Sequence, residues 1–273
     1  MVWLMVLGMS ACSKEQEVSQ SGSATVTDTT NTVTVVYAGN AATATVSDRI
    51  AEYVTVTIED GHVRVVQSEA VGESTGEIVY ALSGSSEDGS FYMEGTYKAT
   101  VELHGLTLTN PSGPAIDIQN GKRIELSAKR GTVNTLTDGT TTLVDAWKGC
   151  LQCKGHLEFK GYGELTVYGH YAHGIWSKEY TSVKNCTISV LSAPADALNC
   201  NQYFLMESGS LSLSGFGDDG ICVSLKSNDT SVENTGNCLI NGGTVTIDMT
   251  GAGGESIKAA GTTTIAEAAT VNR

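Results

Sequence analysis

The sequence predicts an all-β protein that folds as a right-handed, single-stranded parallel β-helix, with rungs of about 23 residues and loop insertions. Three columns of apolar residues recur at that step (188 − 165 = 23 and 211 − 188 = 23): Leu165, Ile188, Leu211; Val167, Val190, Leu213; and Ile175, Leu198, Ile221. Each repeat contains two short alternating strands between Gly- and Asp-rich turns, which places every second side chain on one face. The chain has 6% aromatic residues, 31 Gly and 3 Pro, which suits a narrow core of stacked aliphatic side chains. Propeller blades need roughly 40 residues per repeat and are disfavoured, and the handedness is the usual one for parallel crossovers.

The first 12 residues are predicted to be a lipoprotein signal peptide. The apolar run from Val2 to Met9 is too short to span a bilayer as a helix. Ser10 and Ala11 precede Cys12, which resembles the lipobox of bacterial lipoproteins, whose cysteine is lipidated after cleavage. We therefore expect attachment to the outer membrane through a lipid on Cys12, at the cell surface or on the periplasmic face. A secretory signal with an incidental cysteine is the alternative.

Three further regions follow the signal peptide. Residues 13–30 are rich in polar residues and are predicted to be a flexible tether. Residues 31–98 are expected to form an N-terminal β region, read as early rungs in preference to a separate small sandwich, because no linker follows them. Residues 99–273 are predicted to be the β-helix. The inward column continues by longer steps, of 35 residues from Ile116 to Leu151 and of 36 from Ile221 to Ile257 (151 − 116 and 257 − 221), which leaves room for loop insertions.

Composition also limits the partners. The formal net charge of −14 disfavours nucleic acid and direct binding of polyanions. We expect a monomer that touches a membrane only through its lipid.

Several motifs resemble those of the carbohydrate-binding domain-containing lipoproteins of the pectate-lyase-like (pectin lyase-like) β-helix superfamily. The segments that carry the resemblance are Gly131 to Gly139, Lys154 to Leu157, Tyr203 to Met206 and Gly217 to Ile221, and it spans roughly residues 95–260. The resemblance implies a right-handed parallel β-helix that binds calcium and acidic or cellulosic polysaccharides. The family often carries Asp-Gly-Ile in several rungs, and this chain departs from that motif at residues 173–175, 196–198 and 255–257, so its ion sites are expected to be fewer or altered.

A column of turn residues stands two positions before the inward column. Its acidic members, Asp196, Asp219 and Glu255, are joined by Asp218. Stacked strands are about 4.8 Å apart, so the carboxylates repel one another unless their pKa values rise or a cation lies between them. Oxygen-only ligands select a hard ion, and these four residues are the predicted Ca²⁺ ligands. The alternative is an acidic row that points into water.

Trp176 stands one position after the inward column, in an outward row, and an outward Trp on a polar strand has no core to fill. Sugar rings stack on exposed aromatic faces, so Trp176 is predicted to bind carbohydrate. Four further residues are assigned to the same site: Tyr168, Tyr171, Asn199 and Phe216. A Trp covered by the insertion at residues 118–148 is the alternative.

The sequence leaves three functions open. We predict a surface-anchored protein that binds polysaccharide, depends on calcium for acidic glycans and has no catalytic residues. The first alternative is a polysaccharide lyase that acts on uronides by β-elimination, with Lys258 or Lys178 as base. Asp196 and Asp219 also suit the roughly 5–9 Å carboxylate spacing of glycosidases. The second alternative is a structural or adhesive β-helix without glycan specificity.

Overall fold

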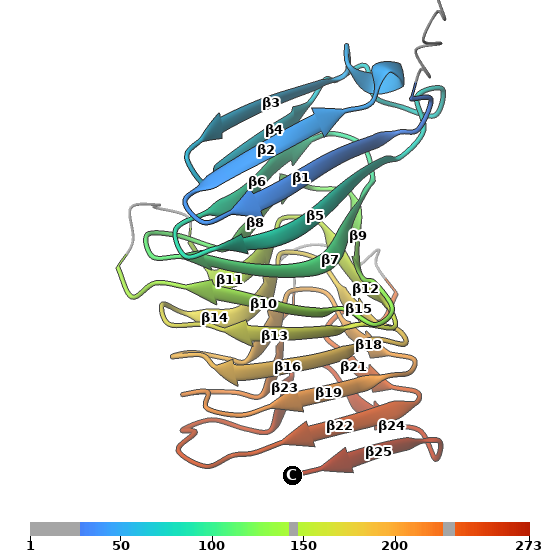
Figure 1. Cartoon of the computed structure of the whole chain (residues 1–273). Coiled ribbons are helices and arrows are strands. Elements are labelled where there is room, and N and C mark those ends of the chain that lie inside the picture. Colours follow the sequence, from blue (N-terminus) through green and yellow to red (C-terminus); the bar gives the residue numbers. More distant parts are fainter. Residues whose placement is uncertain (1–27, 142–146, 226–232) are drawn as a thin grey trace, which may run out of the picture.

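The computed structural model describes residues 28–141, 147–225 and 233–273, so Cys12 and most of the predicted tether lie outside the described residues. Within the described part, the chain forms β-strands and one 3-10 turn, η1 (Asp48–Ile50). The strands make one sheet of 16 strands and another of 9 (Figure 1). The predicted all-β class is confirmed.

The 16-stranded sheet contains two runs of parallel strands that meet at β7. The first run is β5 (Ile78–Ser86), β7 (Ala99–Asn110), β10 (Val133–Asp138), β13 (Glu164–Tyr168), β16 (Thr187–Ser192), β19 (Ser210–Leu213), β22 (Gly243–Ile247) and β25 (Ala269–Asn272). The second run is β9 (Arg123–Ala128), β12 (His156–Gly161), β15 (Thr181–Val183), β18 (Phe204–Met206), β21 (Cys238–Ile240) and β24 (Thr263–Ile265). The first residues of β7 pair with β9 and its last residues pair with β10, which joins the two runs.

The 9-stranded sheet is the third run. It consists of β3 (Val54–Glu59), β4 (His62–Gln67), β6 (Ser90–Gly95), β8 (Ile116–Asn120), β11 (Gly149–Cys153), β14 (His173–Ser177), β17 (Leu198–Cys200), β20 (Ile221–Val223) and β23 (Ile257–Ala259). Leu198 pairs in parallel with Ile175 on one side and Ile221 on the other, which confirms the 23-residue step (198 − 175 and 221 − 198). Ile116 likewise pairs with Leu151, and Ile221 with Ile257, as the two longer steps predicted. From β7 on, the chain therefore visits all three runs in turn and returns to the first.

Two antiparallel hairpins lie at the N-terminal end of the sheets. β1 (Thr32–Ala38) pairs antiparallel with β2 (Ala41–Val46) and parallel with β5. β3 pairs antiparallel with β4, which is parallel to β6. The strands of residues 31–98 thus belong to the same two sheets as the later strands, and the hairpins occupy the upper end of the molecule in Figure 1.

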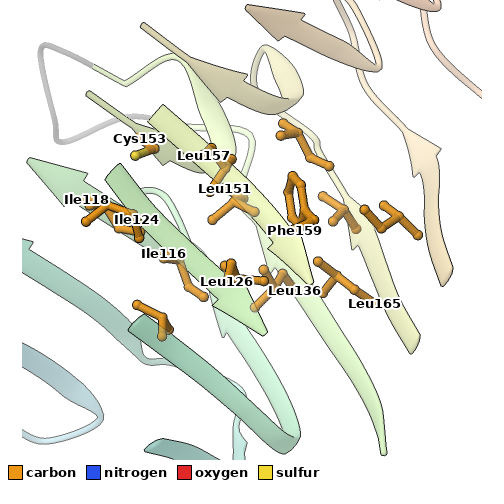
Figure 2. Close-up of a cluster of buried hydrophobic side chains, with 14 of the residues drawn as sticks. Ile116, Ile118, Ile124, Leu126, Leu136, Leu151, Cys153, Leu157, Phe159 and Leu165 are labelled. Atoms are coloured by element: carbon orange, nitrogen blue, oxygen red, sulfur yellow. The ribbon is translucent and has the colours of Figure 1, made fainter. Parts of the chain in front are cut away.

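The core is a column of aliphatic side chains enclosed by the three runs. Figure 2 shows this interior around Ile116 and Leu151 of the 9-stranded sheet, Leu157 of β12 and Leu165 of β13. These four side chains are at most 1% exposed. They come from alternate positions, as in β13, where Leu165 and Val167 are buried and the other three residues of the strand are not. Period-2 alternation therefore builds the core.

Two findings concern the remaining sequence features. None of the six cysteines in the described residues forms a disulfide; Cys153 and Cys200 fill the interior, as small apolar side chains do. Within the same residues, no helix is long and apolar enough to cross a membrane.

Candidate functional site

One row of outward-facing positions crosses the 9-stranded sheet in register. Its paired members are Asp117, Gln152, Trp176, Asn199, Cys222 and Lys258. The strand pairing confirms this row, which the sequence spacing predicted. Trp176 is half-buried, and its neighbours in the row are two amide side chains, Gln152 and Asn199. Gln152 is 1% exposed and accepts from the backbone N–H of Lys148 (2.8 Å), whereas Asn199 is half-buried. The row thus combines a half-buried indole with one accessible amide, that of Asn199, on the adjacent strand.

The two aspartates Asp196 and Asp219 lie beside this row, just before β17 and β20. Asp196 is 4% exposed and Asp219 is fully buried. The backbone N–H of Asp219 donates to Oδ1 of Asp196 (3.0 Å), and that of Glu255 donates to Oδ1 of Asp219 (2.8 Å). The backbone N–H of Asp196 donates in the same way to Nδ1 of His173 (3.3 Å). We call these four residues the acidic ladder, because the side chains of His173, Asp196 and Asp219 each accept the backbone N–H of the next turn, in a series that ends at Glu255.

Protein groups also satisfy the second oxygen of each buried aspartate. Asn199 Nδ2 donates to Oδ2 of Asp196 (2.7 Å), and Lys258 Nζ donates to Oδ2 of Asp219 (2.9 Å). The hydrogen bond and the charge of Asp219 raise the pKa of Lys258 above its ordinary value. A lysine held protonated is a poor general base, so this ion pair weakens the lyase alternative that uses Lys258. Burial of Asp196 and Asp219 leaves little room for the substrate and water that a glycosidase needs.

His173 extends the acidic ladder at its upper end. Burial lowers the pKa of His173, against the opposing effect of the Asp196 carboxylate. A neutral ring that accepts the Asp196 N–H at Nδ1 fits this direction. The predicted column therefore contains a neutral imidazole next to its first carboxylate.

The acidic ladder fits a calcium ion only in part. Gly254 leaves a space that two carboxylates face: a Cβ there would lie 2.3 Å from Oδ1 of Asp219 and 2.5 Å from Oδ1 of Asp218. However, the tightest group of potential ligands is Asp196, Asp219 and the thiol of Cys222, with ligand atoms within 4.8 Å of one another. Burial, followed by the nearby carboxylates, raises the pKa of Cys222 to about 12, so it stays a neutral thiol, and calcium prefers about six to eight oxygens.

The remaining predicted ligands do not complete that set. Asp218 and Glu255 are exposed, and neither belongs to the tight group. The ammonium of Lys258 already compensates the charge of Asp219. Calcium binding here therefore requires Lys258 to leave Asp219, a condition that the sequence did not indicate.

The residues of the predicted carbohydrate site do not form a single unit. Phe216 is 3% exposed and packs in the core, although it also lines a hollow of 440 Å³ with His170 and Pro194. Tyr168 is on β13, in the other sheet from Trp176. Tyr171 stacks on Trp147, with ring centroids 4.2 Å apart. Phe216 is thus placed apart from Trp176, and of the predicted residues Trp176 and Asn199 share one face.

An aromatic stack on the second run escaped the sequence analysis. The ring of Tyr180 lies between His156 and Tyr203, with centroids 4.4 Å and 4.6 Å away. Tyr180 and Tyr203 line a hollow of 260 Å³ together with Lys160, Lys184 and other side chains. The signal was present, because Tyr180 and Tyr203 are also 23 residues apart (203 − 180).

Comparisons with known proteins show which family the chain belongs to. A family model described as "Carbohydrate-binding domain-containing protein" matches residues 71–272. A carbohydrate-binding domain-containing protein of Acetivibrio thermocellus is 24% identical over 119 residues, which is 41% of this chain and 42% of that protein. The chain thus spans less than half the length of this curated relative.

The fold has a solved counterpart. The structure of the polysaccharide lyase-like protein from C. thermocellum, a gadolinium derivative, matches with a TM-score of 0.68 at 20% identity. The match covers 89% of this chain and 100% of that chain. At this identity the likeness concerns the fold alone.

Proposed function

This chain belongs to the family of carbohydrate-binding domain-containing proteins, and on that premise we propose that it binds a polysaccharide without cleaving it. The observation that carries the proposal is the outward row, in which Trp176 stands between Gln152 and Asn199. Carbohydrate sites combine an aromatic surface with a few placed polar groups that fix orientation. An indole offers a large apolar area at low conformational cost, and the half-buried amide of Asn199 is the polar group beside it, while the buried Gln152 binds the backbone N–H of Lys148.

The proposal includes the finer form of the fold. We infer that the three runs wind as a right-handed parallel β-helix, because parallel strands joined by crossovers are right-handed in nearly all known cases. Such a coil presents each outward row as a line along its axis. A long glycan can lie on that line and contact several turns at once.

Two alternatives remain distinct from this proposal. A polysaccharide lyase is the enzyme that the fold comparison suggests, yet the pairing of Lys258 with Asp219 disfavours the first candidate base. A structural or adhesive protein would need no glycan specificity, and the outward Trp176 would then have no ligand. Measuring binding and product release on the same polymer distinguishes both alternatives from the proposed function. A lyase would release product, and a structural protein would not bind.

We expect purified protein to be retarded by neutral glucan in affinity electrophoresis, and Trp176→Ala to lose most of that retardation. Loss of one stacked aromatic contact of about 1.4 kcal/mol would weaken binding about tenfold. Tyr180→Ala on the second run is the matched control and should leave the retardation unchanged. Equal retardation of wild type and Trp176→Ala would contradict the assignment. Accumulation of unsaturated uronides from an acidic polymer would show that the protein is a lyase and not a non-catalytic binding protein.

The proposed location rests on the sequence alone. We propose that a lipid on Cys12 anchors the protein to the outer membrane, on the basis of the small residues that precede this cysteine. Cys12→Ala should then move the protein from the membrane fraction to the soluble fraction of expressing cells. A membrane fraction that is unchanged by Cys12→Ala would rule out this anchor.

A further inference from the structure

The outward row of Trp176 continues beyond the positions that the sequence identified. Asp117 pairs with Tyr92 of β6, and Tyr92 pairs with Arg64 of β4. Arg64 belongs to the β3–β4 hairpin, which precedes the family match at residues 71–272. The N-terminal hairpin thus adds a cation to the same line, next to Tyr92 of β6.

Two hollows of the surface meet at Tyr92. The larger, of 500 Å³, lies between the hairpin and β6 and is lined by His62, Arg64, Asp88, Tyr92 and Asn110 among others. The smaller, of 430 Å³, lies beside the row toward the ends of the strands, where Tyr92 is joined by Gln119 and Lys154, each two positions after a member of the row. Tyr92 is therefore the wall that the two hollows share.

The side chains of this region are held in place before any ligand arrives. The guanidinium carbon of Arg64 lies 5.3 Å from the centre of the Tyr92 ring, and Nη2 of Arg64 donates to Glu94 (2.7 Å). The Tyr92 hydroxyl donates to the same carboxylate. His62 Nδ1 lies 3.0 Å from the Ser90 hydroxyl. Preorganised groups lower the cost of ordering on binding.

The charges around the larger hollow indicate the class of ligand. Glu59 and Asp88 line it, and Glu94 lies beside it, whereas Arg64 is its one permanently charged cation within the described residues. Surplus carboxylate repels an anionic sugar. Carboxylates, an amide, a guanidinium and an aromatic ring together suit the hydroxyl groups and apolar face of a neutral sugar.

We propose that the hollow between the β3–β4 hairpin and β6 is a second glycan subsite, which takes a neutral sugar unit of the same chain that passes over Trp176. This inference rests on the proposed function. Tyr92 and Trp176 are separated by three steps of the row, each about 4.8 Å, or roughly 14 Å in total. A single sugar cannot bridge that span, whereas an oligosaccharide can, so the subsite should make affinity depend on chain length.

The test is isothermal titration of the full chain with neutral β-glucan oligosaccharides of increasing length. For the wild type, affinity should rise once the oligosaccharide reaches from Trp176 to Tyr92. Tyr92→Ala should remove that rise, weakening long chains about tenfold, and should leave short chains unchanged. Arg64→Ala should act in the same direction, because Arg64 orients the Tyr92 ring.

Tyr162→Ala is the matched control. Tyr162 is 57% exposed and also carries an arginine over its ring, Arg130 at 4.2 Å, but it lies in the turn after β12 and lines neither hollow. Tyr92→Phe keeps the ring and should retain the length dependence, which separates binding from a folding defect. If Tyr92→Ala matches Tyr162→Ala on long chains while Trp176→Ala weakens them, the second subsite is refuted and the proposed function stands. If Tyr92→Ala weakens short and long chains equally, the two-subsite path is refuted. If the wild type binds no glycan, both proposals fail.

Discussion

Leu198→Asp should prevent folding. Leu198 is fully buried and pairs with Ile175 and Ile221 in the central line of the 9-stranded sheet. A carboxylate there would lose its hydration without gaining a partner, and an unpaired buried charge costs far more than the roughly 5–15 kcal/mol by which domains are stable unless it is neutralised. Circular dichroism of the purified variant should show no cooperative thermal transition.

Leu191→Asp is the control for this substitution. Leu191 is in β16, is 39% exposed and can place a carboxylate in water. Its melting temperature should stay within a few degrees of the wild type, since surface substitutions usually change stability by less than about 0.5 kcal/mol. A cooperative, wild-type transition for Leu198→Asp would mean that this line is not the core.

Calcium should stabilise Lys258→Met more than the wild type. In the wild type, the ammonium of Lys258 lies 2.9 Å from Oδ2 of Asp219 and compensates its charge. Removing it leaves a buried carboxylate without a counter-ion, near the second carboxylate that faces Gly254. An ion that binds only the folded state adds RT ln(1 + [L]/Kd), about 2.7 kcal/mol at one hundred times Kd.

The measurement is the melting temperature in millimolar calcium and in EDTA. Asp219→Asn in the Lys258→Met background should abolish the difference between the two conditions. We propose further that calcium at this place bridges a uronate to the protein, so binding to polygalacturonate should require calcium while binding to neutral glucan survives EDTA. If calcium does not change the melting temperature of Lys258→Met, the protein has no calcium site at this place.

The fold was predictable where the repeat is regular. A step of 23 residues places Ile175, Leu198 and Ile221 on paired strands, and the outward row follows by counting one position further. This counting did not place Arg64 and Tyr92 in the row. Their partners lie at other steps, 28 residues for Arg64 to Tyr92 and 25 for Tyr92 to Asp117 (92 − 64 and 117 − 92), within a region that no repeat marks.

The site was predictable only in part, because turn residues do not obey strand alternation. Phe216 lies in a turn, where spacing does not fix the direction of a side chain, and it packs into the core. The pairing of Lys258 with Asp219 depends on a 36-residue step that brings the next strand, β23, beside Asp219. The acidic residues predicted a cation site at Asp219, and in the structure the cation there is the ammonium of Lys258.

The most direct test of glycan binding on the outward row is a crystal structure of the protein with a bound β-glucan oligosaccharide. Our account predicts sugar rings along the outer face of the 9-stranded sheet, with one ring against Trp176 and the chain extending toward Tyr92. Sugar bound instead in the hollow beside Tyr180 and Tyr203, with Trp176 free of ligand, would contradict it.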